Sequence, residues 1–158
     1  MALRPDRQVV ADDPSYFMDT TGEAGGIATI STAGSGVSLD NAANVVAYSA
    51  TGSGAIPVGI LMNDVVNKDL TKTHLNYYAN EVQVGDKVNL VTDGWVVTNK
   101  VTGTPAAGAA AYVGVSGNFS ASQTNGAWAP VGRFMTSKDS DGYAKVYVKL
   151  PNATVINS

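Results

Sequence analysis

Apolar and polar residues follow one another in short runs along most of this chain, and the clearest run lies near the C-terminus. Residues 145–150 read Lys-Val-Tyr-Val-Lys-Leu, with an apolar side chain at every second position. A period of two is that of a strand with one buried face and one wet face. Ile56 to Val66 is instead almost continuously apolar, which predicts a strand buried on both faces.

Turn signals separate these runs. Asp93-Gly94 lies between the apolar segments Lys87 to Val91 and Trp95 to Lys100, and Asp-Gly in this setting is one of the strongest short hairpin signals. Ser116-Gly117 and Asp141-Gly142 are interpreted as hairpin turns in the same way. The second half of the chain therefore predicts successive antiparallel hairpins.

The first half has weaker signals of the same kind. We expect strands at Ile27 to Ser31 and Asn44 to Ala50, whereas residues 67–80 predict a loop that holds one helical turn at most. The Pro-Val-Gly of residues 57–59 returns at residues 130–132, an echo that indicates a repeated strand solution. The fold class is predicted to be all-β, a β-sandwich or partly open β-barrel built from short antiparallel hairpins.

The N-terminal segment has a different character. Pro5 and the turn signal Asp12-Asp13-Pro14 favour extended backbone and bends. Val9-Val10 between them could form a short strand. We therefore expect residues 1–20 to be an extended N-terminal arm and residues 21–158 to be a single β domain.

Composition narrows the function classes. Only 15% of the residues are charged, below the roughly 25% that is usual, and the net charge is −3. An acidic chain without clustered Lys and Arg argues against nucleic-acid binding. No apolar run reaches the length of a membrane span, and the N-terminus lacks the apolar core of a secretory signal. The absence of Cys removes disulfides and thiolate metal sites and fits synthesis in a reducing cytoplasm.

Catalytic and metal-binding patterns are weak in this sequence. His74 is the one histidine, with no Gly-x-Ser-x-Gly elbow to accompany it, so a polar loop residue is the favoured interpretation. Residues 138–142, Lys-Asp-Ser-Asp-Gly, look like part of a calcium loop, but no distal Glu follows and a hairpin turn explains them better. We expect no enzyme, no cofactor and no metal. Trp128, in a loop beside Gly126, is the best candidate for an exposed contact.

Four segments resemble the capsid decoration (cement) proteins of tailed phages, especially those of cyanobacterial and marine phages. They are Ala2–Arg7, Gly59–Asp69, Gly94–Asn99 and Asp141–Val148. The resemblance implies a β body that sits on the outer capsid surface of the virion, binds the major capsid protein and stabilises the head. It also implies a homotrimer, made in the host cytoplasm, with no catalytic residues.

The residues that would contact the shell are an inference from the predicted arm. We expect apolar anchors and two Arg that pair with acidic groups, namely Leu3, Arg4, Arg7, Val9, Val10, Tyr16 and Phe17. Two other functions stay open. One is a carbohydrate-binding or adhesion module of a phage fibre or cell surface, which would use Trp128, Tyr143 and Tyr147; the other is a small β-fold hydrolase that uses His74.

Overall fold

The structure is a computed structural model that describes residues 3–31, 45–52, 54–64, 81–82, 87–122 and 130–150. Their strands in chain order are β1 (Leu3–Met18), β2 (Gly22–Glu23), β3 (Ile27–Ile30), β4 (Val45–Ala47), β5 (Pro57–Asp64), β6 (Glu81–Val82), β7 (Lys87–Thr98), β8 (Val101–Thr102), β9 (Ala110–Val113), β10 (Phe119–Ser120), β11 (Pro130–Phe134) and β12 (Ala144–Lys149). A short 3₁₀ turn, η2 (Val115–Gly117), joins β9 to β10. The described part contains no α-helix, which confirms the all-β prediction.

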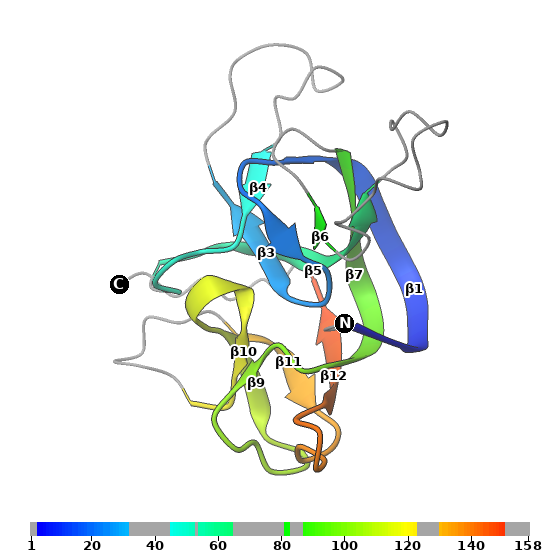
Figure 1. Ribbon diagram of the computed structural model, residues 1–158, viewed down its shortest axis with the longest axis vertical. Coiled ribbons are helices and arrows are strands. Elements are labelled where there is room, and N and C mark those ends of the chain that lie inside the picture. The colour runs from blue at the N-terminus through cyan, green and yellow to red at the C-terminus, as the bar shows by residue number, and fades with distance from the viewer. Residues whose placement is uncertain are drawn as a thin grey trace.

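Ten of the strands form one mixed sheet in the order β1-β4-β3-β5-β7-β12-β11-β9-β10-β8, and β1 also pairs with β7. β2 and β6 form a separate pair. Figure 1 shows β1 running beside β7 along one side of the molecule and then bending across to β4. The sheet order is established, whereas its closure into a sandwich or a partly open barrel stays a prediction.

The sheet carries buried side chains on both faces at its centre. Ile60 and Val91 belong to one core cluster, whereas their chain neighbours Leu61 and Leu90 belong to a second cluster. Successive side chains of a strand point to opposite faces, so β5 and β7 are covered on both sides here. This confirms the prediction from the apolar run that begins at Ile56.

The C-terminal strand follows its sequence pattern. Val146 and Val148 of β12 are fully buried, and Leu150 after it is nearly so, while the intervening residues are accessible. The predicted turn at Asp141-Gly142 lies between β11 and β12, with Gly142 at φ +86. Asp139 accepts backbone N–H bonds from Asp141 and Tyr143, each at 2.9 Å, which closes the turn. The hairpin interpretation of this segment is confirmed.

The segment around Asp93-Gly94 differs from its prediction. Residues 87–98 form the single strand β7, not two strands of a hairpin. β7 pairs with β1, β5 and β12, so its backbone groups are satisfied by three other strands. At Gly94, a Cβ would collide with the carbonyl oxygen of Gln8, because β1 passes very close to this point. The glycine therefore serves a close strand approach instead of a turn.

The Pro-Val-Gly echo has a structural counterpart. Pro57 and Pro130 begin β5 and β11, positions at which a missing N–H is tolerated. A Cβ on Gly59 would press on the backbone of Val91, and one on Gly132 would overlap the carbonyl oxygen of Tyr147. In both strands the glycine admits the backbone of a neighbouring strand.

Candidate capsid-binding surface

β1 is the element that holds all seven residues predicted to contact a shell. The segment is extended, as expected, but it pairs antiparallel with β7 from Leu3↔Thr98 to Phe17↔Lys87. In this chain it is therefore a strand of the main sheet. An arm that reaches a neighbouring subunit stays a prediction.

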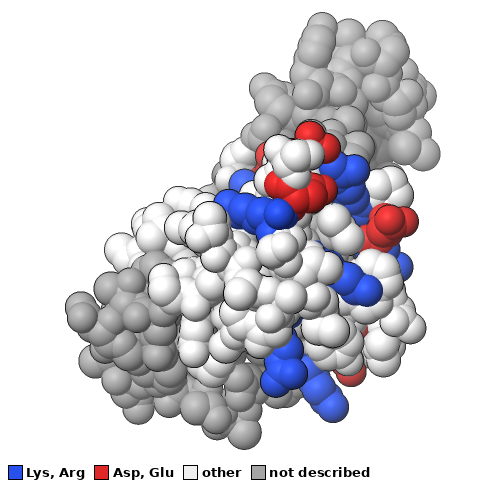
Figure 2. All heavy atoms as spheres, turned by 90° about the horizontal axis from the view of Figure 1, so that it is seen from below, with Lys and Arg blue, Asp and Glu red and all other residues white. Residues whose placement is uncertain are grey.

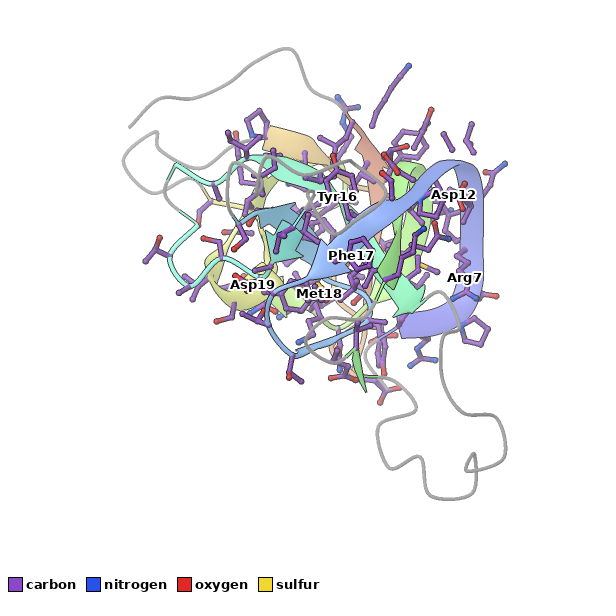
Figure 3. All side chains as sticks on the ribbon, turned by 90° about the horizontal axis from the view of Figure 1, so that it is seen from above. Arg7, Asp12, Tyr16, Phe17, Met18 and Asp19 are labelled. Atoms are coloured by element: carbon purple, nitrogen blue, oxygen red, sulfur yellow. The ribbon has the colours of Figure 1, made fainter. Side chains whose placement is uncertain are left out.

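β1 bends sharply along its length. Its pairing with β7 shifts register at several points, including between Val9 and Ala11 and between Asp13 and Tyr16. The predicted turn at Asp12-Asp13-Pro14 lies inside the strand, although the Ser15 N–H donates to the Asp13 carboxylate at 2.9 Å in a local turn. Figure 3 shows the two limbs that result, with Arg7 and Asp12 along one and Tyr16 to Asp19 along the other.

The first limb begins with two residues that are engaged by the protein itself. Leu3 is only 6% exposed and belongs to the same core cluster as Val101 and Ala144. Arg4 donates to Asp141 at 3.2 Å, and its guanidinium carbon lies 4.0 Å from the centre of the Tyr143 ring. Leu3 thus packs the start of β1 into the core, and Arg4 binds it to the turn between β11 and β12.

Arg4 also lies 4.0 Å from the carboxylate of Asp139, in the same turn. The pKa of Asp139 is lowered, mainly because its carboxylate accepts the Tyr143 backbone N–H. The backbone N–H of Asp141 and the positive charge of Arg4 lower it further. Figure 2, which views the molecule from below, shows basic and acidic side chains side by side on a surface that is mostly uncharged. Arg4 is therefore already paired, whereas we expected it to pair with a shell.

The middle of β1 is the exposed part. Residues 5–12 are all exposed, including Arg7, and the side chains of Val9 and Val10 are 44% and 61% accessible. Val9 and Val10 are therefore two exposed apolar side chains, and the cation of Arg7 lies two residues before Val9. Of the seven predicted contacts, these three are the exposed ones.

The second limb is only partly accessible. Tyr16 packs against the core cluster that contains Val88, and burial raises its pKa, with a further contribution from Asp13. Phe17 is half-buried, with the Lys87 ammonium 6.0 Å from its ring centre. These two aromatic residues hold β1 against the sheet, so we do not assign them a contact with a partner.

A set of side-chain contacts crosses the sheet from the exposed limb of β1 through β7 to β12. The Trp95 indole N–H donates to Gln8 at 3.0 Å, and Lys145 lies 3.9 Å above the Trp95 ring. The Tyr147 hydroxyl donates to Asp93 at 2.9 Å, which raises the pKa of this tyrosine. Trp95 thus contacts side chains of both neighbouring strands, β1 and β12, and packs between them.

A cavity of about 410 Å³ lies elsewhere on the molecule. Tyr48 forms part of its wall, and Lys100 lies 5.5 Å above the Tyr48 ring. The other lining residues are Thr20, Thr21, Gly22, Glu23, Ala50 and Ser116. Burial raises the pKa of Tyr48, whose hydroxyl donates to the Glu23 carbonyl and accepts the Gly26 N–H. Both hydrogen bonds of the Tyr48 hydroxyl are made within the protein, so this side chain has a structural role in the cavity wall.

The remaining candidate sites are the histidine, the loop tryptophan and a metal site. His74 and Trp128 are outside the described residues. Within the described ranges, no group of three or more His, Cys, Asp or Glu is placed to hold a metal ion. Nor does any helix there have the length and apolar character to cross a membrane. Asp12 is exposed, and no surface role was expected for it because Asp-Asp-Pro indicated only a turn.

Residues 8–149 match the model of a family described as structural cement protein (E217 gp24/Pam3 gp6). No curated protein gives a match. The family match covers most of the chain and confirms the resemblance drawn from the sequence, including a capsid-stabilising structural role in the virion, and it does not favour the carbohydrate-binding alternative. The chain belongs to the family of structural cement proteins of phages.

Proposed function

We propose that this cement protein lies on the outer surface of the phage head and binds the major capsid protein there. The family match supports the association with a capsid, and the exposed apolar side chains of Val9 and Val10 support a contact through the first limb of β1. Arg7, two residues before Val9, would pair with an acidic group of the shell. Leu3, Arg4, Tyr16 and Phe17 are left out of the contact because the protein itself engages them.

The proposed contact has a simple energetic basis. A strand that is already ordered in the free protein loses little conformational entropy on binding, unlike a free arm, which would lose about 1–2 kcal/mol per residue. Even a modest apolar contact at Val9 and Val10 can then be net favourable, at about 25 cal/mol per Å² buried. Many copies bound to one shell would add their contributions.

We further propose that the chain is non-enzymatic and acts as a homotrimer. The family is one of structural proteins, which supports the first point. The trimer rests on the resemblance alone, and the mass of the purified protein by light scattering tests it. A monomer at all concentrations would overturn that part of the proposal.

The central experiment adds the full-length protein to purified heads that lack it. We expect regular outer protrusions by electron microscopy and a higher temperature of head disruption. The double variant Val9→Glu/Val10→Glu should abolish decoration. The matched control is Val115→Glu/Met135→Glu, which places the same charges on two other exposed apolar residues. Equal decoration by both variants, or protein found on the inner surface, would overturn the proposal.

A further inference from the structure

The outer edge of β1 is a long sheet edge that has no partner among the described strands over most of its length. β7 pairs with one side of this strand, and β4 pairs with the other side only at Phe17 and Met18. Among the described strands, none pairs with the outer side of residues 3–16. Unpaired N–H and C=O groups on such an edge are a template for another strand.

The residues of this edge read similarly from both directions. Pro5 and Pro14 bound the segment, and neither has a backbone N–H to offer to a partner strand. Moving inward by two residues from each proline, Arg7 meets Asp12 in mirrored position, and Val9 meets Val10 at the centre. A strand with this arrangement is complementary to a second copy of itself in antiparallel orientation.

The side-chain directions fit such a pairing. Arg7 lies opposite Val96 and Asp12 lies opposite Val91, two valines of the same core cluster. Directly opposite residues of an antiparallel pair share a face of the sheet. Arg7 and Asp12 therefore point to the same face, although residues five apart in a regular strand would point to opposite faces. Two register shifts produce this agreement: Val10 is an extra residue on β1 between Val9 and Ala11, and Thr92 is an extra residue on β7 between the partners of Ala11 and Asp12.

On the opposite face of the sheet, Gln8 and Ala11 form a second pair of residues that share a face. Gln8 lies opposite Trp95, and Ala11 lies opposite Asp93, which is two residues from Trp95 and on the same side of β7. Gln8 and Ala11 thus also share a face. Both mirrored pairs, Arg7 with Asp12 and Gln8 with Ala11, satisfy the geometry of a two-fold axis perpendicular to the sheet.

We propose that two copies of this chain pair their β1 edges antiparallel about a two-fold axis between Val9 and Val10. Arg7 of each copy then lies opposite Asp12 of the second copy, which gives two ion pairs in one self-complementary interface. No ion pair within the described residues occupies Arg7 or Asp12 in the single chain. Asp6 opposite Asp13 is a like-charge pair that offsets part of this gain.

This pairing goes beyond the proposed contact with the shell and does not depend on it. It brings Val9 and Val10 of both copies together at the two-fold axis, so one dimer offers these exposed valines of two chains to a capsid. A two-fold contact at β1 is also separate from a three-fold contact elsewhere on the molecule. On a shell, neighbouring copies are held at high effective concentration, so a weak edge contact suffices.

Disulfide trapping tests the pairing and its register. The chain has no cysteine, so Gln8→Cys and Ala11→Cys each introduce a single thiol. In the proposed register these two positions face each other at a separation that a disulfide can bridge. Two copies of either variant alone place their thiols about 10 Å apart along the strand. We expect cross-linked dimers in the mixture of the two variants and few in either alone.

A charge swap identifies the ion pairs. Added to the two thiol variants, Arg7→Asp alone or Asp12→Arg alone should slow cross-linking by about ten-fold. The double change Arg7→Asp/Asp12→Arg should restore the original rate. Equal cross-linking in every mixture, or no rescue by the double change, would overturn the proposal. Absence of cross-links in solution and on decorated heads would also overturn it, and would leave a strand of the shell as the occupant of this edge. Decoration of heads is scored separately, so the two proposals fail independently.

Discussion

Leu3→Ala tests whether β1 is a strand of the body or a loosely attached segment. Leu3 is 6% exposed and packs in the main core cluster, where truncation of a buried leucine costs about 2–5 kcal/mol. Because Leu3 lies at the end of its strand, where the structure can partly collapse around the gap, we expect the lower part of this range, about 2–3 kcal/mol. For a chain of this size that corresponds to a fall in Tm of roughly 4–12 °C.

The matched control is Val10→Ala, on the same strand but 61% exposed, which should change stability by less than about 0.5 kcal/mol. Urea unfolding of both variants, followed by fluorescence of the tryptophans, gives the two free energies of unfolding. Hydrogen exchange should show β1 amides opening more often in Leu3→Ala than in the wild type. If the two variants were equally stable, β1 would not be packed as described, and the reasoning about its exposed limb would fail.

Three further predictions concern the sheet and its turns. Gly132→Ala should lower the free energy of unfolding by at least about 2 kcal/mol, since its Cβ would overlap the Tyr147 carbonyl oxygen, and calorimetry would measure the loss. Asp139 has a lowered pKa in the folded state, so its stabilising contribution is present above the unfolded value of 3.8 and is lost as the pH falls through the lower folded value. Asp139→Asn should therefore remove part of the stability difference between pH 7 and pH 2, as measured by urea unfolding at both. Tyr48→Phe should cost about 1–3 kcal/mol because the Gly26 N–H loses its acceptor, and an unchanged Tm would contradict this assignment.

Local chemistry made several elements predictable from the sequence alone. The alternation of residues 145–150 specified which face of β12 is buried, because a strand has a strict period of two. Ser116-Gly117 and Asp141-Gly142 specified turns through backbone conformations with positive φ. The consecutive apolar residues around Ile60 specified a strand covered on both faces. The family resemblance also came from the sequence, and it gave the structural role.

Only the tertiary structure decided the fate of Asp93-Gly94 and of the N-terminal segment. The same dipeptide can close a hairpin or admit a neighbouring strand, and the choice depends on β1, which lies about 85 residues away in sequence. Likewise, nothing local shows that Leu3 reaches the core or that Arg4 finds Asp141. These outcomes depend on pairings between distant segments, whose energies are shared over the whole sheet. The sequence determined the alternation of β12 and the two-sided burial of β5, and the three-dimensional pairing decided that residues 87–98 form one strand and which residues of β1 are left exposed.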